Sequence, residues 1–203
     1  MKYIKTFENH NNSTLIIVDV QKSFKKYYTD NYLEAVQTYA KKFENAYQIF
    51  DNHHKGKNPD IDYLYDKDHD TEDRSDLYDF GEKDIIEKRY RYDVDAEFYK
   101  KVLSKKVYDE VKSKEDNKQL KRGDFFHTKE GTIIVYIANR HVWFDCPKKL
   151  YDLFISLKGK EVTIIGGSSG ECILDVSVAG KALGVNIIEN KKFIYSASDC
   201  PIK

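Results

Sequence analysis

The chain has 203 residues, and its 34 lysines and arginines balance its 34 aspartates and glutamates, so the composition does not point to nucleic acid or an anionic membrane as an obligatory partner. No apolar run approaches the length of a membrane span, and residues 1–14 contain no apolar segment of the signal type, so we expect no membrane partner. The three cysteines, Cys146, Cys172 and Cys200, are an odd number without the spacing of a disulfide framework, which is typical of a reducing, cytoplasmic compartment.

The first predicted strand is the apolar run at residues 14–20, which carries Asp19 near its end. Such a run is typical of a central strand in a parallel sheet, with its last side chain at the strand's carboxyl end. A carboxylate in this place is costly to bury unless it has a partner, so Asp19 is a candidate site residue. Helix capping, or a position on the surface, is the alternative. Gln21 and Phe24 follow in a segment that starts a loop or helix.

Residues 32–43 have the spacing of an amphipathic helix, and residues 46–50 form a second predicted strand. Asp51 and His53 follow this strand at alternate positions, from which two side chains can point the same way along an extended backbone. The two side chains could ligate a divalent metal such as zinc, although a third ligand is not evident. A polar loop at the end of a strand is the alternative interpretation.

The middle of the chain begins with an acidic stretch, residues 60–84, which contains 11 carboxylates and three basic side chains. Its lack of periodicity predicts a long surface loop. Residues 84–92, with Lys88 among them, could form a short extended piece, and residues 96–118 are predicted to form one charged helix. A further buried strand is predicted at residues 132–138, and Arg140, His141 and Trp143 come directly after it.

The remaining elements alternate in type. A helix at 147–157 precedes an apolar strand from residue 161, a helix from about 171 to 183, and a last strand at 185–189. Alternating strands and helices predict an α/β fold of three layers, α/β/α, with a mostly parallel sheet and a site along the carboxyl ends of its strands. The length favours a single domain over residues 1–203.

The stretch from residue 161 to 176 indicates a nucleophile. Its strand stops at two glycines and two serines, where the backbone can turn sharply, and Cys172 falls in the first turn of the following helix. Backbone N–H groups there lack intrahelical acceptors and the helix dipole is positive, so a thiolate is favoured and an oxyanion could be held. The alternative is a small buried cysteine at a tight turn.

Three groups of residues, each at or after the end of a predicted strand, resemble motifs of the isochorismatase-like cysteine hydrolases, the superfamily that contains the nicotinamidases. Residues 55–131 match poorly and are interpreted as an inserted or rebuilt segment. The three matching groups are Asp19 with Gln21 and Phe24, Asp51 with His53, and the glycine-rich turn of residues 165–172 with its continuation at 182–185.

The resemblance implies that Cys172 is a nucleophile, that Asp19 accepts its proton, and that backbone N–H groups near Ser168 and Cys172 form an oxyanion hole beside a cis peptide. The reaction implied is hydrolysis of a small molecule at an amide-type C–N bond through a thioester, with no required cofactor. A homo-oligomer is also implied. The residues expected to bind substrate are Gln21, Phe24, Ser168, Ser169 and, as part of an aromatic pocket, Trp143. A position in the core or at the rim is the alternative for the aromatic residues.

The family also places a lysine beside the aspartate and the cysteine, and the sequence leaves its identity open. Lys88 fits best by its neighbouring residues, whereas the strand predicted just before the nucleophile's strand is followed by Arg140 and His141. If neither position supplies a cation at the site, a second interpretation gains weight. The chain would then be a catalytically inactive protein of the same fold that binds a small molecule or a protein partner.

Overall fold

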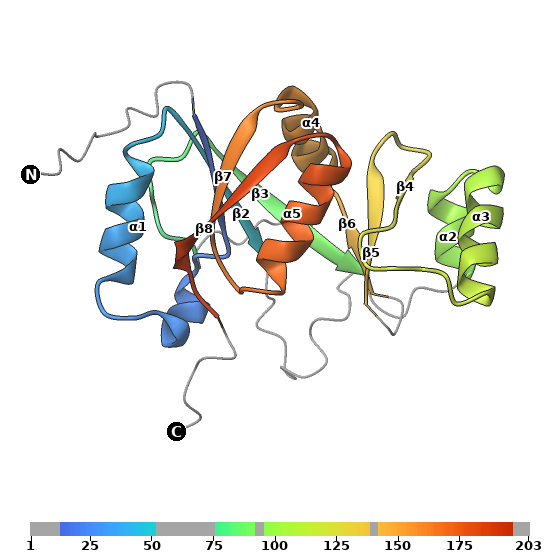
Figure 1. The fold of residues 1–203 in the computed structure, drawn as a ribbon, viewed down its shortest axis with the longest axis horizontal. Coiled ribbons are helices and arrows are strands. Elements are labelled where there is room, and N and C mark those ends of the chain that lie inside the picture. Colours follow the sequence, from blue (N-terminus) through green and yellow to red (C-terminus); the bar gives the residue numbers. More distant parts are fainter. Residues whose placement is uncertain (1–12, 52–75, 92–95, 139–141, 197–203) are drawn as a thin grey trace, which may run out of the picture.

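The computed structural model describes residues 13–51, 76–91, 96–138 and 142–196. Within these residues, eight strands form one sheet with the order β4-β5-β6-β3-β2-β1-β7-β8 (Figure 1). The strands are β1 (Thr14–Val18), β2 (Asn45–Asp51), β3 (Asp84–Arg91), β4 (Phe125–His127), β5 (Ile133–Ala138), β6 (Val142–Asp145), β7 (Glu161–Gly166) and β8 (Asn186–Ile194).

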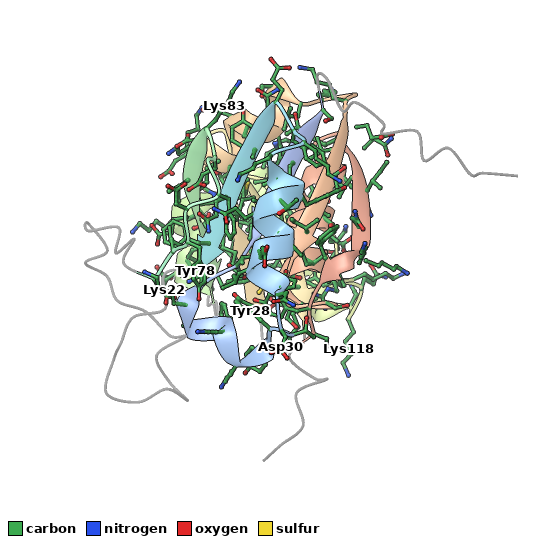
Figure 2. The ribbon with its side chains drawn as sticks, turned by 90° about the vertical axis from the view of Figure 1, so that its left-hand side faces the viewer. Lys22, Tyr28, Asp30, Tyr78, Lys83 and Lys118 are labelled. Carbon is green, nitrogen blue, oxygen red and sulfur yellow. The ribbon has the colours of Figure 1, made fainter. Side chains whose placement is uncertain are left out.

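The helices lie on both faces of this sheet. In β1, Leu15 and Ile17 pack into the cluster under α1, while Ile16 and Val18 pack into the cluster under α4 and α5, because successive side chains of a strand point to opposite faces. Figure 2 shows α1 lying in front of the sheet. The helices are α1 (Tyr32–Ala40), α2 (Ala96–Val102), α3 (Lys105–Asp116), α4 (Lys148–Ser156) and α5 (Cys172–Ala182), with a 3₁₀ helix at Lys22–Tyr27.

Five of the strands, in the order β3-β2-β1-β7-β8, run parallel to their neighbours. This part of the structure is α/β, with a mostly parallel sheet and helices on its two faces, and is consistent with the predicted three-layer arrangement. In Figure 2, Lys83, just before β3, lies at one edge of the sheet, and Lys22 and Tyr28, which follow β1, lie at the opposite edge. The carboxyl ends of β1, β3 and β7 therefore meet at this second edge.

The other three strands form an antiparallel extension, which corrects one prediction. Residues 132–138 were expected to form a parallel strand, but β5 pairs antiparallel with both β4 and β6. The physical reason is β6, which the sequence analysis did not predict. Only residues 139–141 separate it from β5, and a parallel crossover needs a dozen residues or more. Strand β6 in turn pairs antiparallel with β3 and joins the extension to the parallel strands.

The predicted helix at 96–118 is two helices, α2 and α3. The helix is interrupted at Ser104, which is the N-cap of α3. Its backbone is extended, and its side chain accepts a hydrogen bond from the Val107 N–H at 3.4 Å. Both helices cover the cluster around Trp143, at the end of the molecule opposite α1 (Figure 1). Among the described residues, none of the helices has the length and apolarity that crossing a membrane requires.

Candidate active site

Asp19 immediately follows β1 and is the first residue of the candidate site. Its backbone takes the left-handed conformation, with φ of 50°, which is uncommon for a residue other than glycine. The Asp19 N–H donates to the Ile49 carbonyl at 2.8 Å, and the Asp19 carbonyl accepts from the Tyr195 hydroxyl at 2.8 Å. The residue is only 1% exposed. These contacts hold a buried carboxylate at the carboxyl edge of the sheet.

Lys88, one of the candidate cations, lies directly beside this carboxylate. It lies on β3 beside Asp51 of β2, and its Nζ is 2.5 Å from Asp19 Oδ2. Both side chains are buried, at 0% and 1% exposure. A lysine is almost never fully buried unless its charge is paired, so this contact accounts for the position of both residues. The alternatives, Arg140 and His141, lie outside the described residues.

Cys172 is the first residue of α5 and is half-buried. The strand that leads to it, β7, is the direct neighbour of β1, and the Gly167 N–H donates to the Val18 carbonyl at 3.0 Å. The Gly167–Ser168 peptide bond is cis. Burial is the largest cause that raises the pKa of Tyr195, and the charges of Asp19, Tyr28 and Cys172 add to it. The hydrogen bond from Gly167 to Val18 places the turn that leads to Cys172 beside the residue that precedes Asp19.

Two glycines make this close approach possible. A Cβ on Gly166, whose φ is +109°, would lie 1.9 Å from the Val18 carbonyl oxygen. A Cβ on Gly167 would lie 2.2 Å from the ring of Tyr195. Real Cβ atoms do not approach other atoms so closely, so a larger residue at Gly166 would push the turn away from β1, and one at Gly167 would displace the turn or the Tyr195 ring. These contacts explain why glycine occupies both positions of the turn.

Three residues that the sequence analysis did not single out extend the site away from Lys88. Lys88 Nζ lies 3.4 Å from the Tyr90 hydroxyl oxygen and 4.8 Å from its ring centre. The Tyr90 hydroxyl donates to Asp175 Oδ2 at 3.1 Å, and the Arg122 guanidinium pairs with the other oxygen of Asp175. The spacing of two of these residues could have indicated them from the sequence. Tyr90 is two residues after Lys88, on the same face of a strand, and Asp175 is one helical turn after Cys172.

Burial and neighbouring charges have opposite effects on the pKa values of Asp175 and Tyr90. Burial raises the pKa of Asp175, whereas Arg122, the Tyr90 hydroxyl and Lys88 act to lower it. Burial also raises the pKa of Tyr90 well above its ordinary value, and the Lys88 charge opposes that rise. Tyr90 therefore stays a neutral phenol that can donate one hydrogen bond and accept another.

The predicted substrate-binding residues after β1 lie near the site. Gln21 is 1% exposed, and its side-chain amide donates to Asp76 Oδ2 at 3.0 Å. Asp76 also accepts from the Ser23 N–H at 2.8 Å and the Ser23 hydroxyl at 2.6 Å. Phe24 is half-buried, with its ring centre 6.5 Å from that of Tyr195. The end of the acidic stretch thus fixes Gln21, a role for Asp76 that its sequence context did not reveal.

Trp143 lies in another part of the molecule from these residues. It is completely buried, its indole N–H donates to the Tyr99 hydroxyl at 3.1 Å, and it packs in the cluster under α2 and α3. The structure therefore makes Trp143 a core residue of the antiparallel extension and does not bring it to the Asp19 pair. At the turn itself, Ser168 is buried and Ser169 is exposed.

The metal hypothesis concerns Asp51 and His53. Asp51 is the last residue of β2, and His53 lies outside the described residues. In the part of the chain that the structure describes, no three His, Cys, Asp or Glu side chains are grouped as a metal ion would require.

Comparison of the chain with protein-family models, with curated proteins and with solved structures gave no match. The chemistry of the candidate site therefore follows from three groups at the carboxyl ends of the parallel strands. They are a carboxylate, an ammonium and a thiol. A carboxylate can accept a proton, an ammonium can stabilise a nearby negative charge, and a thiolate can attack a carbonyl carbon. This combination can perform covalent acyl transfer.

Proposed function

We propose that this protein has an isochorismatase-like fold and is a cysteine-dependent hydrolase of a small molecule, acting at an amide-type C–N bond through a thioester. The observation that carries the proposal is the buried contact of 2.5 Å between Lys88 Nζ and Asp19 Oδ2, at the sheet edge where Cys172 begins α5. The resemblance in sequence requires a lysine beside this aspartate. Lys88 meets that requirement in the residues described.

In the proposed reaction, the Cys172 sulfur attacks the amide carbon while Asp19 takes the thiol proton. The C–S bond forms, the C–N bond breaks, and the proton passes to the leaving nitrogen, which departs as ammonia or an amine. Water then attacks the thioester, the C–S bond breaks, and the acid leaves with the thiol restored. Lys88 favours the thiolate by its positive charge, and backbone N–H groups near the turn stabilise the oxyanion.

The burial of the pair supports a catalytic role. Because charges interact more strongly away from water, a buried ammonium and carboxylate act on a neighbouring thiol with little screening. Perturbed titratable groups that gather around a nucleophile are typical of active sites, although ion pairs that only stabilise a fold exist as well. The half-buried position of Cys172 supports the catalytic case, since a thiol of this kind can be reached by a substrate.

The test uses p-nitrophenyl acetate, an activated acyl donor that needs no knowledge of the natural substrate. We expect the wild-type protein to release p-nitrophenolate, to gain one acetyl group on Cys172, and to lose it again by hydrolysis, as intact and peptide mass spectrometry would show. Cys172→Ser should lose the adduct, whereas Cys146→Ser, which removes a completely buried thiol, should keep it.

An acetyl group that never forms on Cys172, or that forms and is not hydrolysed, would contradict the proposal. The alternative, a binding protein of the same fold, is compatible with both of these outcomes, because a binding site needs neither a reactive thiol nor a water that attacks the thioester. If the acetyl group does turn over, the next step is to screen amides for ammonia release.

A further inference from the structure

The contacts of Lys88 continue through a chain of hydrogen bonds to the surface of the molecule. The Lys88 ammonium touches the Tyr90 hydroxyl, that hydroxyl donates to Asp175, and Asp175 accepts from Arg122. The donors and acceptors are consistent along the whole chain. A neutral phenol that gives its proton to Asp175 presents only its lone pairs to Lys88, which has only donors to offer.

This arrangement determines the direction of the ammonium. An ammonium has three N–H groups, and contacts with Asp19 and Tyr90 direct two of them. The rotation about the Cε–Nζ bond is then fixed, and with it the direction of the third N–H. The ring of Tyr90, with its centre 4.8 Å from Nζ, restricts the position of the ammonium from the side. Without the Tyr90 hydroxyl, the ammonium would lose one of these contacts and its position would be less restricted.

Asp175 connects this series of hydrogen bonds to the helix that carries the nucleophile. It lies one turn after Cys172 on α5, and residues three apart lie on neighbouring parts of a helix surface. Its side chain is 6% exposed, so its negative charge needs a partner. Arg122, from the segment between α3 and β4, is that partner, and its side chain is 37% exposed. The antiparallel extension therefore reaches the candidate active site through one guanidinium.

We propose that Tyr90, Asp175 and Arg122 are positioning residues that hold the Lys88 ammonium in the orientation in which it activates Cys172. This inference rests on the proposed function, because it takes Lys88, Asp19 and Cys172 as the reactive centre. It adds a role for the region between β3 and β4 that the resemblance did not cover. Through Arg122, this region sets the reactivity of a thiol on the parallel part of the sheet.

The sign of each change follows from the charges around the thiol. Loss of the Tyr90 hydroxyl releases the ammonium, and loss of Arg122 leaves the negative charge of Asp175 near Cys172 without compensation. Both changes disfavour the thiolate, so the reactivity of Cys172 should move to higher pH. The described titratable groups near the thiol include Asp19 after β1, Lys88 and Tyr90 on β3, Tyr195 after β8, and Glu171 and Asp175 on its own segment.

The experiment measures the rate of iodoacetamide alkylation at Cys172 in the full chain, by peptide mass spectrometry, from about pH 5 to about pH 9. We expect Tyr90→Phe to lower the rate at neutral pH by about three- to tenfold, with the profile moved upward by about half to one pH unit. Arg122→Gln should move it in the same direction, and Arg122→Lys, which keeps the charge, should restore most of the wild-type profile. A role in packing alone would not be restored in this way.

The matched control is Tyr99→Phe, which removes another buried phenol hydroxyl, one that accepts a hydrogen bond from Trp143 in the cluster under α2 and α3. Its profile should match the wild type. Equal shifts in Tyr99→Phe and Tyr90→Phe would overturn the inference. If Tyr90→Phe does not fold, Arg122→Gln carries the same test, because its side chain is partly exposed.

Two further variants separate this inference from the proposed function. If Lys88→Met moves the profile while Tyr90→Phe and Arg122→Gln do not, the positioning role is refuted and the proposed function stands. If Lys88→Met and Asp19→Asn also leave the profile unchanged, the reactive centre itself is refuted.

Discussion

The parallel and antiparallel parts of the sheet are built from similar apolar strands but place side chains differently. In β3-β2-β1-β7-β8, neighbouring strands end at the same edge, so residues far apart in sequence, such as Asp19 and Lys88, come into contact there. In β4, β5 and β6, successive strands end at opposite edges. Their buried polar contact, between Trp143 and Tyr99, lies under helices instead.

The difference shows which part of the molecule can assemble a reactive site. Strand direction, and not apolar content, decides whether polar residues at strand ends meet. The extension contributes to the site through Arg122 alone among the contacts described above. Changes in the parallel part should therefore affect both stability and the reactivity of Cys172, and changes deep in the extension should affect stability alone.

The largest effect is expected at Lys88. Lys88→Met leaves the buried Asp19 carboxylate without its cation, which should lower the free energy of unfolding by about 3–5 kcal/mol. The control is Lys149→Met, which breaks the partly exposed pair of Lys149 and Asp84, with Nζ and Oδ1 2.7 Å apart, and should cost about 0–1 kcal/mol. Urea unfolding measures both. Equal losses of unfolding free energy in the two variants would show that Lys88 and Asp19 do not form a buried ion pair.

Alanine substitutions at two glycines, Gly166 and Gly131, test how closely the turn before Cys172 approaches β1. Gly166→Ala places a Cβ against the Val18 carbonyl and should cost about 3 kcal/mol or prevent folding, with loss of Cys172 reactivity. Gly131 of the extension also has positive φ, but its Cβ would meet nothing within 4 Å. Gly131→Ala should therefore cost only about 1 kcal/mol, from backbone strain. Similar costs in urea unfolding would mean that β7 does not approach β1 as closely as described.

A smaller effect on stability, and none on the thiol, is expected for Trp143→Phe. The change removes the hydrogen bond to Tyr99 and part of a completely buried side chain, at a cost of about 1–3 kcal/mol in unfolding free energy. The rate of Cys172 alkylation in the folded protein should stay at the wild-type value. A fall in that rate would place Trp143 in the site after all.

The smallest effect is expected at Cys146. Burial, with the Asp145 charge as a second cause, raises the pKa of the Cys146 thiol. A raised pKa keeps the thiol protonated as the pH increases, so iodoacetamide should not modify Cys146 in the folded protein at neutral or mildly alkaline pH. In urea it should react as Cys172 does. Native modification of Cys146 as fast as that of Cys172 would contradict the difference in burial.

The sequence predicted the parallel strands better than the antiparallel ones. Strands at 14–20, at 46–50 and from residue 161 were recognised because their apolar runs are bounded by polar or glycine residues. Residues 132–138 have the same pattern but a different direction, which depends on the partner strand and not on the run itself. Strand β6 has only four residues, and the polar residues before it were interpreted as a site at a strand end.

Part of the candidate site was singled out from the sequence. Asp19 and Cys172 were candidates because their chemistry interrupts apolar segments, and Lys88 was one because its neighbouring residues resemble a known motif. Tyr90, Asp175 and Arg122 were missed, since each is ordinary in its local context and acquires a role only through contacts across the fold. Arg122 and Asp175 are 53 residues apart, and no local pattern connects them.

The most direct test of the account is a double-mutant cycle on the rate of Cys172 alkylation at neutral pH, with Asp19→Asn, Lys88→Met and the combined variant. If the buried pair activates the thiol as one unit, each single change lowers the rate by about ten- to a hundredfold, and the combined variant is no slower than the slower single one. Rates unchanged from wild type, or losses that multiply in the combined variant, would contradict the account.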